Sequence, residues 1–233
     1  MLSSVPQKSV LLIKHSNTWS GDRCSAWFES HGFNLHWCYP CEGQALPNPN
    51  EFDVAVIYGG RNSVNDNEDW INEEARWLEG CLESRCKYLG ICFGAQQLAK
   101  ILGAQVWKHS HALKEIGFTP VQATGDDTQL LPLPEKLFQW HGDGFDVPSG
   151  AQLLASSERF PNQAFRFEKH YAVQFHPEVN HCVISQWFKS NTDYESEFLD
   201  PDSRAATLAY AQQHDDTISG WFDSFMQRWL GTT

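Results

Sequence analysis

The most constraining feature of this sequence is a cysteine held between two glycines, where an apolar run gives way to a helix-forming run. Residues 88–91 are apolar, Cys92 follows, and the residues up to Gly103 favour helix, so the order predicts strand, sharp turn and helix. Gly90 and Gly94 lie two residues before and after the cysteine, the spacing of a nucleophile elbow with sulfur in place of oxygen. Side chains at those positions would collide with the neighbouring strand and helix. We therefore expect Cys92 to be a nucleophile near a helix N-terminus, where thiolate is favoured.

A second informative stretch lies more than eighty positions downstream, where an apolar run from Tyr171 ends in a histidine and a proline. Pro177 ends the strand, because proline cannot donate to a sheet. His176 and Glu178 would then supply a base and its orienting carboxylate from one turn. Taken alone, Cys92 is more often a buried core thiol, and the His–Glu pair is more often a strand end beside a helix start. Together the two motifs predict a thiol hydrolase.

The first half of the chain alternates apolar runs with amphipathic ones. This alternation predicts a flavodoxin-like, doubly wound α/β fold with a largely parallel central sheet. In such sheets the ligand crevice lies beyond the carboxyl ends of the strands, where Gly59, Gly60 and Cys92 fall. The expected strands cover 9–13, 34–39, 53–58 and 88–91, and the expected helices cover 22–31, 69–85 and the run that ends at Gly103.

The second half begins with short runs and turn residues, which predict an antiparallel extension of the sheet. From Val179 onward the pattern is helical, and its last turns carry an apolar face that packs on the chain's own domain or on a partner. We expect a domain over 1–190 and a helical C-terminal extension over 191–233 that packs on it. The expected short strands cover 104–107, 115–123, 137–140, 152–155, 164–167 and 171–175.

Charge and composition exclude several partners. The net charge is −12 and no Lys/Arg cluster is present, which argues against binding to nucleic acid or to an anionic membrane. No apolar run is long enough for a membrane helix or a signal peptide. Seven scattered cysteines indicate reduced thiols and a cytoplasmic protein.

Two weaker patterns do not amount to sites. Cys38 and Cys41 form a C-x-x-C followed by glycine and prolines, which predicts a loop rather than a redox pair at a helix start. His109 and His111 lack a third ligand at motif spacing, so a solvated loop is expected. The sequence predicts neither a metal site nor a cofactor.

With these residues in hand, the chain resembles a class I glutamine amidotransferase of the stand-alone type, similar to the amidotransferase domain of GMP synthase. The resemblance covers about residues 1–190 and is highly specific in its cysteine and His-Pro-Glu motifs. Glu115 to Phe118 also resembles a family segment near the site. The motifs that carry the resemblance are Gly59-Gly60, Gly90 to Gln96, Phe138 to Asp143 and Gln174 to Glu178.

The resemblance implies that Cys92, His176 and Glu178 form a triad that hydrolyses the side-chain amide of glutamine through a γ-glutamyl thioester. Ammonia would pass to an unknown acceptor, such as one bound by a synthetase partner. The backbone N–H groups of Gly60 and Phe93 would form the oxyanion hole. Gly59, Gln96 and the loop Trp140, His141, Gly142 and Asp143 would bind the small-molecule substrate.

Two departures leave alternatives open. Ala95 stands where many relatives carry histidine, and Arg61 and Asn62 follow the glycine pair where relatives often have proline or a small residue. No P-loop or ATP-pyrophosphatase loop is present, so the ammonia acceptor cannot be identified. One alternative is a γ-glutamyl peptidase that cleaves γ-glutamyl amides with the same triad. The other is a non-catalytic binding or regulatory module.

Overall fold

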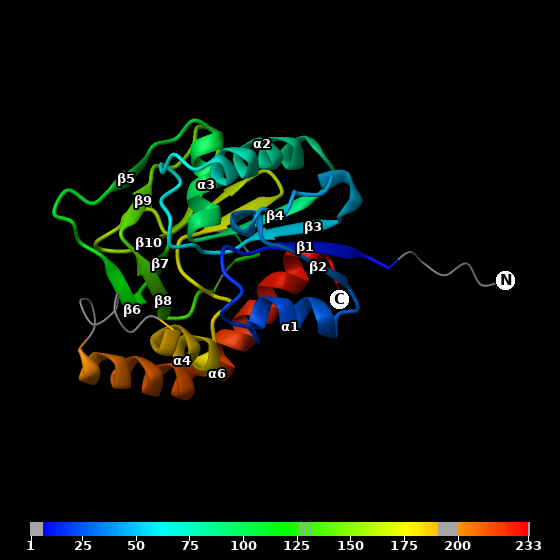
Figure 1. Ribbon diagram of the computed structural model, residues 1–233. Coiled ribbons are helices and arrows are strands. Elements are labelled where there is room, and N and C mark those ends of the chain that lie inside the picture. Colours follow the sequence, from blue (N-terminus) through cyan, green and yellow to red (C-terminus); the bar gives the residue numbers. More distant parts are fainter. Residues whose placement is uncertain (1–6, 126, 128, 131, 191–199, 233) are drawn as a thin grey trace.

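An eight-stranded sheet runs through the centre of the protein in its computed structural model (Figure 1), which describes residues 7–125, 127, 129–130, 132–190 and 200–232. The first five strands in spatial order are parallel and the last three alternate in direction, which confirms the parallel core with an antiparallel extension. In order across the sheet they are β2 (Asn34–Cys38), β1 (Ser9–Ile13), β3 (Val54–Ile57), β4 (Lys87–Ile91), β12 (His170–Val173), β11 (Ala164–Phe167), β10 (Gln152–Ser156) and β7 (Gln122–Ala123).

The position of β12 matters most for the site. This strand pairs with β4 in parallel, with Val173 opposite Ile91. Because parallel neighbours end at the same edge of a sheet, the residues that follow the two strands leave it side by side. Cys92 follows β4, and His176 follows β12 after two further residues.

Four short strands of the second half do not join the large sheet. They pair two by two, β5 (Val106–Lys108) with β9 (Asp143–Phe145) and β6 (Glu115–Pro120) with β8 (Lys136–His141). The expectation that 104–107, 115–123 and 137–140 extend the main sheet is therefore wrong except at Gln122–Ala123 (β7), and β9 was not predicted. Strand propensity does not specify which strand becomes the neighbour, so tertiary contacts decide these pairings.

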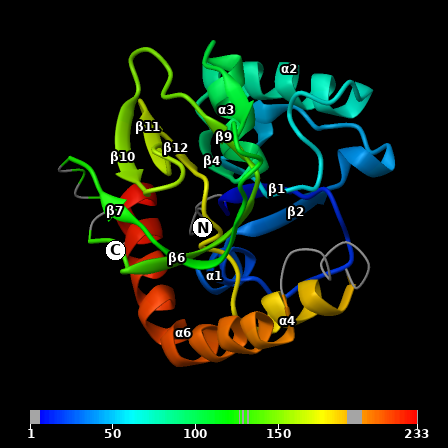
Figure 2. The ribbon, with the colours of Figure 1, turned by 90° about the vertical axis from the view of Figure 1, so that its left-hand side faces the viewer.

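Helices cover both faces of the sheet, as Figures 1 and 2 show from two directions. On one side lie α2 (Asp69–Glu83) and α3 (Phe93–Ile101), and on the other lie α1 (Arg23–Ser30) and the C-terminal part of α6 (Pro201–Leu230). A shorter helix, α4 (His181–Ser190), packs against α6, and two 3₁₀ turns, η1 (Pro40–Glu42) and η2 (Pro49–Glu51), interrupt the loop before β3. None of the described helices has the length and hydropathy of a bilayer span.

Each face of β1 contributes to a different core. Val10 and Leu12 belong to the cluster that contains the apolar side of α6, whereas Leu11 and Ile13 belong to the cluster under α2 and α3. All four side chains are buried, which explains why this strand has an unbroken apolar sequence rather than an alternating one.

Helix α6 begins with strong capping. Asp200 accepts hydrogen bonds from the N–H groups of Asp202 and Ser203, and Pro201 occupies the first helical position. Its last turns bury the apolar face noted in the sequence, and the indole of Trp221 donates to the carbonyl of Leu130 at 2.9 Å. The division into 1–190 and 191–233 stays a prediction, and residues 191–199 lie outside the described part of the chain.

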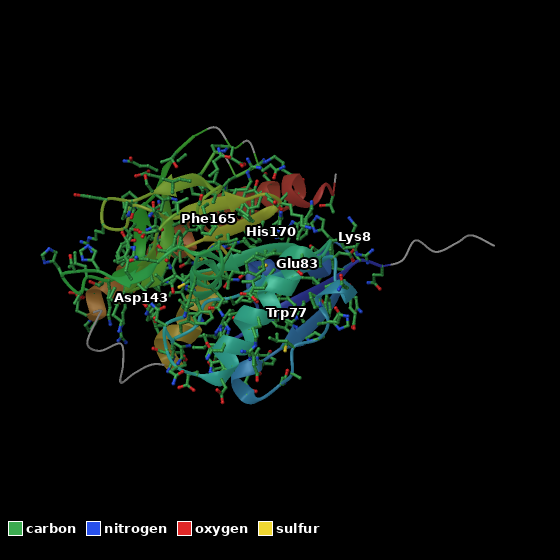
Figure 3. All side chains as sticks on the ribbon, turned by 90° about the horizontal axis from the view of Figure 1, so that it is seen from above. Lys8, Trp77, Glu83, Asp143, Phe165 and His170 are labelled. Atoms are coloured by element: carbon green, nitrogen blue, oxygen red, sulfur yellow. The ribbon has the colours of Figure 1, made fainter. Side chains whose placement is uncertain are left out.

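His170, labelled in Figure 3, makes the stability of the fold sensitive to acid. Neither ring nitrogen has a partner among the described residues, and burial, with a smaller contribution from Lys169, lowers the pKa to about 4. In the unfolded chain the pKa of this histidine is near 6.5. Between pH 6.5 and 4 the unfolded chain therefore binds a proton at His170 that the folded protein does not bind. The free energy of unfolding should fall as pH drops from 6.5 towards 4, by about 3 kcal/mol in total.

Replacing His170 by leucine should remove this part of the acid dependence. Urea unfolding curves between pH 4 and pH 7 would measure it, with the exposed His111→Gln as the matched control. If the free energy of unfolding falls equally steeply with decreasing pH in wild type and in His170→Leu, His170 is not the source of the acid dependence.

Candidate active site

Cys92 lies in a strained turn between β4 and α3. Its φ of 51° is unusual for a residue with a side chain, and its N–H donates to the carbonyl of Val173 at 2.8 Å. A Cβ at Gly90 would lie 2.5 Å from the carbonyl oxygen of Gly94, and one at Gly94 would lie 2.3 Å from that of Ile57. Both glycines are therefore required by close approach of backbone to backbone.

The turn that follows β12 holds a buried histidine and carboxylate. Nδ1 of His176 and Oε1 of Glu178 are 2.8 Å apart, and their side chains are 4% and 0% exposed. The backbone N–H of His176 donates to the carbonyl of Phe138, which fixes the turn against β8. Since the carboxylate accepts at Nδ1, the opposite nitrogen, Nε2, is left to exchange protons with another group.

The cysteine and the histidine converge on one glycine. A Cβ at Gly59 would lie 2.6 Å from Cε1 of His176 and 3.4 Å from Cβ of Cys92. The two side chains line the same cavity of about 470 Å³, in which the thiol also donates to the carbonyl of Trp140 at 3.9 Å. Nε2 of His176 makes no hydrogen bond of normal geometry to a described residue. Such bonds are often long before a substrate is bound.

The charges around His176 favour its protonated form. Burial lowers the pKa of His176, but the carboxylate of Glu178 and then the sulfur of Cys92 more than offset it, so the pKa rises to about 10. At neutral pH the imidazolium can therefore act as a proton donor to a group in the cavity.

Two backbone N–H groups near Cys92 could bind an oxyanion. Phe93 is the first residue of α3, so its N–H has no acceptor within the helix. Gly60 lines the cavity, and a Cβ there would lie 2.9 Å from Nδ1 of His15. The ring of Phe93 is buried away from the cavity, so only its backbone could take part.

The loop at residues 140–143 borders the cavity and is held by buried polar contacts. Nε2 of His141 lies 3.2 Å from Oε2 of Glu115, and Nδ1 lies 3.0 Å from the carbonyl of Asp143. Gln96 donates to that same carbonyl at 3.1 Å, and Ser63 donates to the carboxylate of Asp143 at 2.6 Å. The side chains of His141 and Gln96 therefore hold the loop. Figure 3 labels Asp143 towards the other end of the molecule from His170.

Arg23, at the start of α1, binds the backbone carbonyls of the His-Pro-Glu turn. One guanidinium nitrogen donates to the carbonyls of Pro177 and Val179 at 2.6 and 2.8 Å, and the backbone N–H of Arg23 donates to that of Glu178 at 2.7 Å. The other terminal nitrogen pairs with Asp215 of α6 at 2.7 Å. Three consecutive carbonyls of the turn are thus bound by one residue.

A second buried cation, Lys14, lies within electrostatic reach of the carboxyl group of Glu178. Nζ of Lys14 donates to the carbonyl of Trp19 and lies 3.4 Å from the centre of that indole ring. Burial lowers the pKa of Lys14 to about 8, against the opposing effect of Asp22 and Glu178. The lysine is therefore mostly charged at neutral pH.

Replacing Arg23 by methionine should be costly, because it leaves buried carbonyls of Pro177 and Val179 without donors. We expect the free energy of unfolding to fall by about 3 kcal/mol, and the turnover to fall with it as the turn loosens. Chemical denaturation followed by fluorescence would measure the first effect. Arg85→Met, at an exposed position, is the control, and equal stability of the two variants would refute the role of Arg23.

The cavity gathers nearly all the residues that the sequence singled out. Two of them do not line the cavity. Glu178 lies behind His176, and the side chain of Phe93 is buried. The remaining predicted residues line it, namely Cys92, His176, Gly59, Gly60, Gln96, Trp140, His141, Gly142 and Asp143.

Sequence reasoning missed several residues of the same cavity. His15 follows the first strand, and its position at a carboxyl strand end could have identified it. Trp19 and Trp187 carry no such pattern. By contrast, the sequence had already singled out Arg61, Asn62 and His109, which line the outer part of the cavity together with Lys108, Leu113 and Lys114.

Of the residues in the two weaker patterns, only His109 borders the cavity, at its outer part. Cys41 lies in η1 and Cys38 ends β2, and both thiols are free. His109 and His111 have ring centres 5.8 Å apart in a loop. Within the described ranges, no group of three or more His, Cys, Asp or Glu side chains could hold a metal ion.

Comparison with known proteins supplies an independent view. The family model for glutamine amidotransferase class I matches residues 33–189. A glutamine-hydrolysing GMP synthase subunit from Thermoplasma volcanium is 36% identical over 157 residues, which cover 62% of this chain and 75% of that protein. The GMP synthase of Paraburkholderia phymatum is 36% identical over 141 residues, 55% of this chain and 25% of that protein. The chain thus spans about a quarter of this longer relative.

Among solved structures, a glutamine amidotransferase from Thermotoga maritima superposes on the chain with a TM-score of 0.88 at 28% sequence identity. The superposition covers 96% of this chain and 98% of that one. The likeness therefore extends over α6 as well as over the sheet.

Proposed function

We propose that this chain, which belongs to the glutamine amidotransferase class I family, hydrolyses the side-chain amide of glutamine with Cys92, His176 and Glu178 as a catalytic triad. The observation that carries the proposal is the meeting of Cys92 and His176 at the ends of two parallel neighbouring strands, in one cavity, with Glu178 on the far side of the imidazole. Nucleophile, base and orienting group are then in the order that thiol hydrolysis needs.

In the first half of the reaction, the sulfur of Cys92 attacks the side-chain amide carbon of glutamine. The negative charge that develops on the amide oxygen would be stabilised by the N–H groups of Gly60 and Phe93. His176, protonated at neutral pH, gives its Nε2 proton to the departing nitrogen, and ammonia leaves. The product is a γ-glutamyl thioester on Cys92.

In the second half, the now neutral His176 takes a proton from water, which attacks the thioester carbon. The carbon–sulfur bond breaks, glutamate is released and the thiolate–imidazolium pair is restored. Throughout both halves, Glu178 would hold the ring with Nε2 towards the cavity.

We infer that the ammonia passes to a separate synthetase. The relative from Thermoplasma volcanium is named as one subunit of a glutamine-hydrolysing GMP synthase, which supports delivery to a partner chain. A partner could also order the site, so a low turnover of the protein alone would agree with this inference.

A second candidate, hydrolysis of larger γ-glutamyl amides, is favoured by the outer part of the cavity. The space of about 470 Å³ extends beyond Cys92 to Arg61, Lys108 and Leu113, which leaves room for a leaving group larger than ammonia. The same three residues of the triad would serve both reactions.

One comparison distinguishes the two candidates. Ammonia release from glutamine is measured beside cleavage of γ-glutamyl dipeptides, at matched concentrations and with a Cys92→Ala control. A higher kcat/KM for glutamine supports the amidotransferase, whereas a much higher kcat/KM for dipeptides assigns the peptidase.

A further inference from the structure

His15 is a buried histidine of the cavity that belongs neither to the proposed triad nor to the loop at residues 140–143. It lies just after β1, and its side chain is 2% exposed. Its ring is flanked by the aromatic rings of Trp70 and Phe93, at centroid distances of 5.0 and 4.6 Å. These contacts fix the plane of the imidazole and leave its two nitrogens to face polar partners.

Both ring nitrogens of His15 face oxygen atoms. Nδ1 lies 3.3 Å from the carbonyl oxygen of Gly59, and Nε2 lies 2.9 Å from Oε2 of Glu74. A carbonyl oxygen can only accept, so Nδ1 must carry a proton and donate it. Glu74 is fully buried and its carboxyl group lies against Nε2, so the ring is held between two oxygen-bearing partners.

The contact with Gly59 determines the direction of the next N–H. The carbonyl of Gly59 and the N–H of Gly60 belong to one planar, trans peptide unit, in which they point in opposite directions. Neither glycine has a side chain to restrict this unit, so a hydrogen bond is needed to hold it. If the unit were turned over, it would present a carbonyl oxygen where the proposed mechanism requires a donor.

We propose that His15, held by Glu74, is a positioning residue that keeps the carbonyl of Gly59 turned towards itself and thereby aims the N–H of Gly60 at the oxyanion. This inference rests on the proposed function, in which Gly60 is one of the two donors. The ring also packs against Phe93, the residue of the other donor, and against Gly60 itself. One imidazole thus contacts both halves of the oxyanion hole.

The test compares His15→Asn with His15→Leu, both in a Glu74→Gln background so that neither leaves a buried charge unpaired. The amide nitrogen of asparagine occupies the place of Nδ1 and can donate to Gly59, whereas leucine has similar size and no donor. Loss of one oxyanion donor costs about 10²–10³ in kcat. We expect kcat of the leucine variant to be lower than that of the asparagine variant by about 10², with KM of the two within about threefold because the interaction acts in the transition state.

Alkylation of Cys92 by iodoacetamide is the second readout. It displaces iodide from a saturated carbon and forms no oxyanion, so its rate should be the same in both variants. A fall in alkylation that matches the fall in kcat would overturn the inference, because His15 would then act on the nucleophile. If the leucine variant does not fold, His15→Gln with Glu74 intact replaces it, since glutamine reaches Glu74 and not Gly59.

The kinetics use glutamine and γ-glutamyl-p-nitroanilide, which both form a tetrahedral oxyanion. Equal kcat in the asparagine and leucine variants, with an active wild type, overturns the role of His15 and leaves the proposed function intact. No hydrolysis of either substrate by the wild type overturns the proposed function, and the role of His15 with it.

Discussion

Replacing Cys92 by alanine should abolish glutamine hydrolysis, with a fall in kcat on the order of 10⁶-fold. Alanine keeps the backbone of the elbow but removes the sulfur that would form the thioester, and the imidazolium of His176 has no group to activate. Ammonia release measured by a coupled assay would give the size of the fall. The fold should persist, because the methyl group of alanine occupies the position of Cβ of Cys92.

The matched control is Cys182→Ala, which removes an exposed thiol from α4 and should keep full activity. A glutamine analogue with an electrophile in place of the amide should label wild type on Cys92 alone, as located by mass spectrometry. Unchanged hydrolysis in Cys92→Ala would exclude the triad and favour the third possibility, a binding or regulatory module on this fold.

Glu178→Gln should lower kcat by up to about 10⁴, the loss seen when the corresponding acid of serine proteases becomes an amide. The neutral amide can present its N–H to Nδ1 of His176, which turns the ring to the wrong tautomer. The substitution also removes the negative charge that raises the pKa of His176 against the lowering effect of burial. The imidazolium should therefore be lost at lower pH.

The pH profile follows from the direction of this shift. With the pKa of His176 raised to about 10, the imidazolium needed to protonate ammonia persists at neutral pH, and kcat should fall as pH rises through about 10. In Glu178→Gln this alkaline limb should move to lower pH. The exposed Glu79→Gln serves as the control. An alkaline limb at the same pH in Glu178→Gln and wild type would show that Glu178 does not govern this imidazole.

The same shift contributes to stability with a definite sign. A histidine whose pKa is higher in the folded protein than in the unfolded chain stabilises the fold at low pH. The contribution of His176 should be complete below pH 6.5 and lost as pH rises towards 10. The effect of His170 has the opposite sign, because its lowered pKa destabilises the folded protein as pH falls below 6.5.

Much of the fold could be predicted because its rules are local. The unbroken apolar runs at 9–13 and 88–91 predicted buried parallel strands, and the structure has β1 and β4 there. The short strands at 104–107 and 137–140 were recognised but assigned to the wrong sheet, and Asp143–Phe145 was missed. An apolar pattern indicates a strand but not its neighbour, so pairing with segments far along the chain decides which sheet these strands join.

By itself, the sequence determined the turn at Cys92, since the glycines on either side are demanded by backbone contacts within a few residues or with the adjacent strand. It also identified His176 and Glu178 by their spacing after an apolar run. Only the tertiary structure assigned partners to His15 and Arg23. Both act through backbone carbonyls of residues far along the chain, Gly59 in one case and Pro177 and Val179 in the other. Every residue has a carbonyl, so such contacts leave no mark in the sequence and exist only once the chain is folded.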